Sequence, residues 1–290
     1  MLCCAHFNHC IRGEAAQEDE NFVRAFCEKH SLKLLSEKAD VPAYADKNSL
    51  STETAARKLR YEFLERARIL SGTGFIATAH HLSDNAESIL LHFFRGSGLN
   101  GLCGMKYCSG KIIHPLLDFE KKELVEYLLQ NGERFRTDET NFVPDTARNL
   151  LRLRIIPEIQ NGINSGCEKV ICRNAKLLNE DEKYLNGVAK EVYLNAKTEN
   201  GVDAEKLVAL PMPIKSRAVM HMLRENGVQT DVFQPHIEAL TKLLEMQSGA
   251  RIEMSTVTIR KSFGRLLVEN KSCTKRDCGN NSGFDPKGKN

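Results

Sequence analysis

The chain has 290 residues, of which 41% are hydrophobic and 27% charged, a composition typical of globular domains and not of disordered or fibrous chains. Its formal net charge is +3, and the last twenty residues supply all of it, with five Lys or Arg against two Asp. Bulk charge therefore does not indicate a nucleic-acid partner, and any basic surface must be local.

No apolar run approaches the roughly 18 residues that indicate a membrane span. The N-terminus MLCCAHFNHCIRGE lacks the basic start and apolar run of a signal peptide, so we expect a cytoplasmic protein with no membrane partner. The ten cysteines are then expected to be reduced thiols, mostly small buried hydrophobes. Metal binding is the alternative for the C-x4-C pairs, which are Cys103/Cys108, Cys167/Cys172 and Cys273/Cys278.

In the first half of the chain, short apolar runs alternate with helical patterns. The clearest helix is predicted over 51–71, where apolar residues recur at helical spacing from Ala56 to Leu70. Asp118 is expected to cap a helix over 120–131. This alternation predicts an α/β fold with an open, mainly parallel sheet and flanking helices. The other expected elements are strands at 2–7, 31–36, 75–79 and 111–117 and helices at 15–30 and 84–95.

After about residue 157 the pattern becomes mostly helical. A long helix is predicted over 166–197, because apolar residues recur along it on one stripe. Two shorter helices (215–226 and 234–246) and a hairpin (250–260 with 264–269) follow. We therefore expect a first domain at 1–160, a smaller helical domain at 161–270 and a disordered polar tail at 271–290.

The segment Ala79-His80-His81-Leu82-Ser83-Asp84-Asn85-Ala86-Glu87 follows a predicted strand and opens a helix. Ligands of open α/β sheets collect at such strand ends. Asp84 and Glu87 are three residues apart, so one helical face presents both carboxylates, which could hold Mg²⁺ or an ammonium group. The alternative is a capping aspartate and a glutamate that complements the helix dipole.

Two groups of arginines share helix faces. Arg57 and Arg60 lie on the face of the 51–71 helix opposite its apolar stripe, and Arg148 and Arg152 are four residues apart on a later helix. Their forked donors suit phosphate or carboxylate groups. The alternative is a solvated face with ion pairs.

His6 and His9 follow the first predicted strand and are expected at its carboxyl end; the alternative is a polar loop. The run Gly96-Ser97-Gly98-Leu99-Asn100-Gly101 matches G-x-G-x-x-G, but it follows a helix. A dinucleotide site requires this motif to follow a strand, so we reject that interpretation.

Each of these features is weak alone, but their order along the chain is specific. A-H-F-N-H-C-I-R-G, E-x3-R-x2-R-Y, A-T-A-H-H-L-S-D-N-A-E-S, R-G-S-G-L-N-G-L-x-G-M, H-P-L-L, D-x2-N and R-N-x2-R occur in succession from residue 5 to residue 152. In this order they resemble the tRNA(Ile)-lysidine synthetase family of N-type ATP pyrophosphatases, which share the PP-loop. The resemblance continues weakly to about residue 269.

The resemblance implies an adenine-nucleotide α-hydrolase-like fold and an ATP-dependent ligase. That family adenylates a wobble cytidine of isoleucine tRNA, and the amine of L-lysine then displaces AMP to give lysidine. It implies that ATP and Mg²⁺ are used and that residues 161–270 recognise tRNA. By position, Asp84 and Glu87 would orient lysine, with Asp84 also a Mg²⁺ ligand. Further roles by position are phosphate or tRNA contact for Arg57, Arg60, Arg148 and Arg152, and a place near the nucleotide for His6, His9 and His81.

Two departures from the family pattern stand out. Ser83 occupies a position where the family usually has aspartate, and the S-G-G-x-D-S loop that holds ATP phosphates is not in the sequence. The sequence resembles a member that lacks its first strand and loop at the N-terminus, and we predict that this chain alone is poorly stable and does not turn over ATP. The alternatives are an inactive paralogue that only binds tRNA, or another PP-loop enzyme such as a tRNA thiolase. The sequence leaves the oligomeric state open, with a homodimer as one option.

Overall fold

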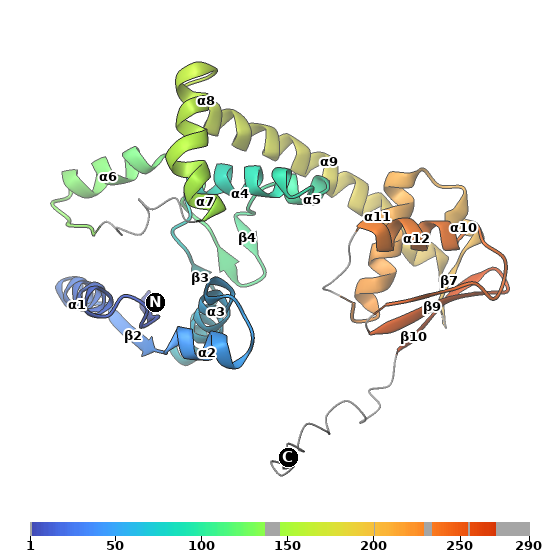
Figure 1. Cartoon of the computed structure of the whole chain (residues 1–290), viewed down its shortest axis with the longest axis horizontal. Helices are drawn as coiled ribbons and strands as arrows, with labels where there is room; N and C mark the ends of the chain where they lie inside the picture. Colours follow the sequence, from blue (N-terminus) through green and yellow to red (C-terminus); the bar gives the residue numbers. More distant parts are fainter. Residues whose placement is uncertain (1, 137–145, 200, 229–233, 255, 271–290) are drawn as a thin grey trace, which may run out of the picture. The chain divides into compact units, whose positions relative to one another are not determined.

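A computed structural model describes residues 2–136, 146–199, 201–228, 234–254 and 256–270 (Figure 1). The predicted tail at 271–290 and the D-x2-N motif at 138–141 lie outside these residues. Contacts divide the chain into two compact units, Met1–Leu178 and Asn179–Asn290, which are described separately. Among the described helices, none is long and apolar enough to cross a membrane.

The first unit alternates strands and helices, as expected for an α/β fold. The predicted helices and strands in this half all have counterparts, and their ends shift by up to four residues. The strands are β1 (Cys3–Asn8), β2 (Lys33–Lys38), β3 (Ile76–Ala77), β4 (Cys108–Ser109) and β5 (Ile112–Ile113). The helices are α1 (Glu14–Lys29), α2 (Val41–Lys47), α3 (Thr52–Ser71), α4 (Leu82–Phe94), α5 (Leu99–Leu102), α6 (Lys121–Gln130), α7 (Ala147–Leu150), the π-helical turn η2 (Leu151–Ile155), α8 (Ile156–Gly162) and the start of α9 (Cys167–Ala196).

Parallel pairing dominates the strands of the first unit. β1 pairs with β2 in parallel from Cys3 opposite Lys33 to Asn8 opposite Lys38. β3 pairs in parallel with β5, and β4 is antiparallel to β5. The described strands thus form a two-stranded and a three-stranded sheet, and α3 packs against both β1 and β3.

The helix α3 forms where the sequence predicts it, because both of its ends are capped locally. The Ser51 side chain accepts a hydrogen bond from the N–H of Thr54, and Gly72 ends the helix with a positive φ of 67°. The buried residues Phe63 and Ala67 pack in one cluster with Phe7 of β1. Burial of this stripe fixes α3 against the first sheet.

The cap of α6 differs from the prediction. Asp118 does not cap this helix, because its carboxylate accepts hydrogen bonds from the Tyr107 hydroxyl (2.5 Å) and from Lys176 Nζ (2.5 Å). The helix begins after Glu120, whose N–H donates to Glu123 Oε2 at 2.7 Å. The N-cap residue is thus Glu120, two positions after the predicted one, because the Asp118 carboxylate bonds to Tyr107 and Lys176 instead.

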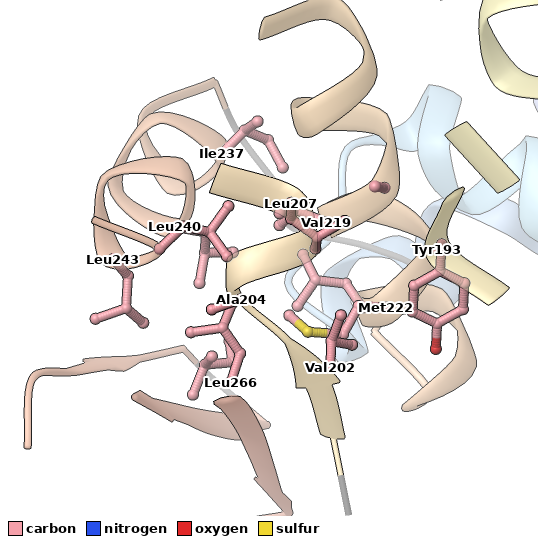
Figure 2. Close-up of a cluster of buried hydrophobic side chains, with 14 of the residues drawn as sticks. Tyr193, Val202, Ala204, Leu207, Val219, Met222, Ile237, Leu240, Leu243 and Leu266 are labelled. Carbon is pink, nitrogen blue, oxygen red and sulfur yellow. The ribbon is translucent and has the colours of Figure 1, made fainter. Parts of the chain in front are cut away.

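The second unit combines helices with an antiparallel sheet. Its core joins apolar residues of both kinds of element, including Leu240 and Leu243 of one helix and Leu266 of a strand (Figure 2). The long predicted helix is α9, and the predicted hairpin is present, although the stretch 250–260 contains two strands instead of one. The remaining elements are β6 (Lys197–Thr198), β7 (Gly201–Asp203), α10 (Glu205–Val208), α11 (Met212–Glu225), α12 (Gln234–Leu243), β8 (Arg251–Glu253), β9 (Val257–Ser262) and β10 (Arg265–Asn270), with the sheet order β6-β7-β10-β9-β8.

Candidate functional site

A cavity of about 370 Å³ lies between β1 and β3; we call it the histidine cavity. Its apolar wall includes Phe7 and Leu64, and its polar wall includes His6, His9, His80 and Arg60; Ala5, Tyr61, Ala77, Thr78 and Ala79 complete the lining. Both strands contribute their carboxyl-terminal ends to it, where ligands of open α/β sheets bind.

Three histidines of this cavity are held toward the neutral form. Burial lowers the pKa of His6, His9 and His80, and the positive charge of Arg60 lowers the pKa of His9 further. His6 Nε2 and His9 Nδ1 are buried, and neither has a hydrogen-bond partner among the described residues. A buried polar atom without a partner is unfavourable, and both nitrogens belong to residues that line the cavity.

A second group of charged residues, the carboxylate–guanidinium cluster, consists of Asp84, Glu87, Arg148 and Arg152. Arg152 donates from Nε to Glu87 Oε1 (2.7 Å) and from Nη2 to Glu87 Oε2 (2.9 Å), a bidentate pair. The same Nη2 donates to Asp84 Oδ1 at 3.0 Å. One guanidinium therefore joins both carboxylates that the sequence places on one face of α4.

Glu87 is the most buried member of the cluster, with 1% of its side chain exposed. Burial raises the pKa of Glu87, and the hydrogen bond and charge of Arg152 oppose this rise. Hydrogen bonding to Glu87 in turn raises the pKa of the Arg152 guanidinium. Arg152 therefore stabilises the negative charge of Glu87, which burial alone would disfavour.

Arg148 reaches the same carboxylate from the preceding helical turn. Its Nε lies 3.6 Å from Glu87 Oε2, and this buried nitrogen has no hydrogen-bond partner within the described part of the chain. Thr146 caps α7 by accepting from the N–H of Asn149, and the π-helical turn η2 follows. Such turns occur frequently at functional sites, and this one carries Arg152.

Arg57 and Arg60, the other two predicted arginines, contact an aromatic ring. Arg57 and Arg60 stack on the ring of Tyr61, at 4.7 and 5.3 Å from its centroid. In the described ranges, the hydrogen bonds and ion pairs of Asp84 and Glu87 are made with other residues, among them Arg152. The arginines that meet the carboxylates are thus Arg148 and Arg152, while Arg60 belongs to the histidine cavity.

The two histidines at the start of α4 have different contacts: His81 contacts Asp84, and His80 lines the histidine cavity. The His81 N–H donates to Asp84 Oδ2 (3.1 Å), and its Nε2 lies 3.4 Å from the same oxygen, so His81 orients Asp84 at the helix N-terminus. His80, which the sequence analysis did not select, lines the cavity and hydrogen-bonds through Nδ1 to Thr78 Oγ1 (2.9 Å). The charges of Asp84, Arg60 and Arg148 all act on His80, which connects the cavity electrostatically with the cluster.

The glycine-rich run is packed against α4, which precedes it as predicted. The buried Asn85 accepts a hydrogen bond from the Met105 N–H (2.8 Å). Gly104 has a φ of 68°, and a Cβ there would lie 2.7 Å from Asn85 Oδ1, while a Cβ at Gly101 would lie 2.5 Å from Ser97 Cβ. These glycines therefore permit close packing next to the cluster.

The first 159 residues match a single family description, that of the PP-loop domain. The chain belongs to the PP-loop family. This match covers the cavity, the carboxylate–guanidinium cluster and every predicted site residue, and membership implies the use of ATP. It also confirms the α/β fold predicted from the sequence.

Relatives named tRNA(Ile)-lysidine synthase confirm the resemblance predicted from the motifs. Identity is 33% over 276 residues with the protein of Caldanaerobacter subterraneus, which covers 93% of this chain and 59% of that protein. It is 35% over 266 residues for Bacteroides thetaiotaomicron (91% and 61%) and 32% over 287 residues for Bacillus subtilis (92% and 60%). The chain thus spans about 60% of the length of these relatives.

Among solved structures, the U34-tRNA thiolase NcsA of Methanococcus maripaludis with its [4Fe-4S] cluster has a TM-score of 0.46 and 18% identity, over 60% of each chain. This likeness is too low to favour one function over another.

Proposed function

We propose that this protein converts the wobble cytidine of isoleucine tRNA to lysidine, with ATP and L-lysine as substrates and an adenylated cytidine as intermediate. The observation that carries the proposal is the carboxylate–guanidinium cluster, because the reaction brings a cationic amine beside an anionic phosphate: the amine bonds to the cytidine ring and AMP leaves. The names of the relatives across more than nine-tenths of the chain support it.

In this proposal each part of the cluster has a role that its chemistry suits. Asp84 and Glu87 orient the ammonium group of lysine, and Arg148 and Arg152 hold phosphate oxygens with forked donors. His6 and His9 would lie beside the nucleotide in the histidine cavity, where burial lowers the pKa of each and so favours an uncharged ring. Fixed groups of this kind accelerate reaction by orientation and by charge stabilisation.

Mg²⁺ fits one of the two carboxylates. The ion is usually held by one or two carboxylates together with phosphate oxygens and water. Asp84 is 17% exposed, and although its oxygens accept from Arg152 and from the His81 N–H, each has a second lone pair, whereas the Glu87 side chain is only 1% exposed. When bound, the ion would neutralise charge on the ATP phosphates, and the residue that would hold it is Asp84.

The proposal also assigns a function to each of the two predicted domains. Residues 1–160 would form the catalytic domain, and residues 161–270 would recognise the tRNA. The first compact unit extends to Leu178, which includes the first turns of α9 with the catalytic part.

A chimera with a full-length relative tests this function. The segment of the Bacillus subtilis relative that matches this chain is replaced by this chain's residues, and lysidine formation is measured on isoleucine tRNA with ATP and lysine. We expect lysidine to form, and we expect Asp84→Asn to reduce the rate at least about 100-fold. The control is Glu158→Gln, since Glu158 is 69% exposed and lies outside the cluster.

A folded chimera that binds tRNA but forms no lysidine would contradict the proposed reaction and favour a protein that only binds tRNA. The purified 290-residue chain is measured beside it by ATP–pyrophosphate exchange. We expect no exchange for this chain alone, because its sequence does not contain the S-G-G-x-D-S motif.

A further inference from the structure

The hairpin of β9 and β10 has an unusual residue at its tip. Ser262 pairs with Arg265, which leaves Phe263 and Gly264 as a two-residue loop. Both loop residues have positive φ, 45° for Phe263 and 75° for Gly264. Loops of this kind strongly prefer Asn, Asp or Gly at the first position, because a Cβ is strained at positive φ. The backbone therefore disfavours phenylalanine here.

Packing does not explain the phenylalanine either. Its side chain is 93% exposed, the largest value for any large hydrophobic residue in the described ranges. The loop around it is nevertheless anchored: the Phe263 N–H donates to Ser248 Oγ (2.8 Å), and the Gly249 N–H donates to the Lys261 carbonyl (2.8 Å). The strand pairing and these bonds hold the ring out in solvent on a fixed backbone.

The charges near the tip are nearly balanced. Arg265 is exposed and forms no ion pair with a described residue, but it lies opposite Asp203 in the sheet register, and Glu205 lies beside Gly264. Lys261 donates to the Leu244 carbonyl. A partner recognised mainly by charge would need a stronger electrostatic field than this hairpin tip provides. The exposed ring of Phe263 instead suits a ligand with a flat, uncharged face.

We propose that Phe263 is a stacking platform for an unpaired nucleobase of the tRNA, with Arg265 beside it for the adjoining phosphate. This rests on the proposed function, which supplies an RNA as substrate. Unpaired bases are recognised in many proteins by stacking on exposed aromatic side chains. A strained conformation that no packing requires is typical of residues kept for function.

The substitution Phe263→Asn separates function from folding. Asparagine suits the loop better than phenylalanine, so we expect the melting temperature of the full chain to rise by about 2–4 °C. Loss of one stacking contact should weaken binding of unmodified isoleucine tRNA about tenfold, measured by fluorescence anisotropy. The slope of log K against log[KCl] should stay unchanged, because no charge is removed.

Three further variants complete the experiment. Phe263→Tyr keeps the ring and should bind like the wild type, while Arg265→Gln should reduce the salt slope by about one phosphate contact. Tyr184→Gln is the control: it removes another exposed aromatic ring of the same unit, 72% exposed on α9, and should leave affinity unchanged.

Equal tRNA affinity of the wild type and Phe263→Asn would overturn the stacking role and leave the proposed function intact. A loss of affinity together with a lower melting temperature would also overturn it, since general damage would then explain the loss. If the wild type binds no isoleucine tRNA, the proposed function fails first and the stacking role falls with it.

Discussion

Substitution of Arg152 by methionine probes the cluster most directly. Glu87 is 1% exposed, and Arg152 donates to both of its oxygens. Removing one partner of a buried ion pair destabilises a protein by about 3–5 kcal/mol, because the remaining charge is desolvated. Arg148 stays 3.6 Å away, and the Arg152 side chain is 28% exposed, so we expect a value near the lower end, about 3 kcal/mol.

The reverse substitution, Glu87→Gln, should be milder. Its amide oxygen can still accept from Arg152, and that guanidinium keeps Asp84 at 3.0 Å and some contact with water. We expect a loss of about 1–2 kcal/mol. The double variant should be no less stable than Arg152→Met alone, since the unpaired buried charge is gone. This corresponds to a coupling energy of about 1–3 kcal/mol.

The effect should depend on pH in a defined direction. Burial already raises the pKa of Glu87, and without Arg152 the native pKa rises further. Native Glu87 then binds a proton that the unfolded chain releases above about pH 4.5. The free energy of unfolding of Arg152→Met should therefore fall as pH rises from about 4.5 toward the native pKa, with a larger deficit at pH 8 than at pH 5.

These free energies of unfolding are measured by urea titration, with hydrogen exchange of α4 peptides as the readout. A local readout is needed because the chain has two units, which can unfold separately. The control is Arg154→Met, since Arg154 is 72% exposed and, within the described part of the chain, its ion-pair partner is Glu158 one helical turn away; it should change stability by less than about 0.5 kcal/mol. The reasoning is refuted if Glu87→Gln is the more damaging change, or if the Arg152→Met deficit is the same at both pH values.

Three further predictions concern packing, titration and capping. Gly104→Ala should lower the free energy of unfolding by about 2 kcal/mol, more than Gly110→Ala, because a Cβ at Gly104 meets Asn85 whereas one at Gly110 meets nothing within 4 Å; denaturant titration compares the two. Burial lowers the pKa of His80, so stability should fall as pH drops below about 6.5, where the unfolded chain binds the proton first; His80→Gln should flatten this part of a Tm–pH profile. Ser51→Ala removes the α3 cap and should destabilise by about 1 kcal/mol, seen as faster hydrogen exchange in the first turn.

The elements that the sequence predicted well carry their signals locally. The helix expected at 51–71 is α3, Thr52–Ser71, and the one expected at 166–197 is α9, Cys167–Ala196. Each has a long apolar stripe, and the caps of α3 are adjacent residues. The short α2 was not predicted, although Asp40 caps it by accepting from the Ala43 N–H, because seven residues are too few to show a helical period.

The site was only partly predictable for a physical reason. Spacing along one helix places Asp84 with Glu87, and Arg148 with Arg152. It cannot show that these pairs meet, since 65 residues separate Glu87 from Arg152. Spacing also cannot show which arginines meet the carboxylates: Arg57 and Arg60 were candidates because they share a helix face, and they stack on Tyr61.

The histidines at the start of α4 show a second limit. His80 and His81 are adjacent, so only one of them can be the N-cap residue of α4. The sequence does not show which of the two side chains lines the cavity. The backbone of His81 is committed to Asp84, which leaves His80 to line the cavity. Which histidine lines the cavity therefore depends on its position relative to the helix cap, since both residues have the same side chain.

The pairing within the cluster constrains how it can bind charged ligands. Two carboxylates and two guanidinium groups are formally neutral together, and Arg152 is already held at 2.7–3.0 Å by three oxygens. A phosphate alone would have to draw Arg152 away and leave Glu87 buried with an uncompensated charge, which is strongly unfavourable. An ammonium group that arrives with the phosphate can replace the guanidinium at the carboxylates. The geometry therefore favours a site that exchanges its internal ion pair for an anion and a cation together, as the proposed function requires when an amine attacks an adenylated cytidine and AMP leaves.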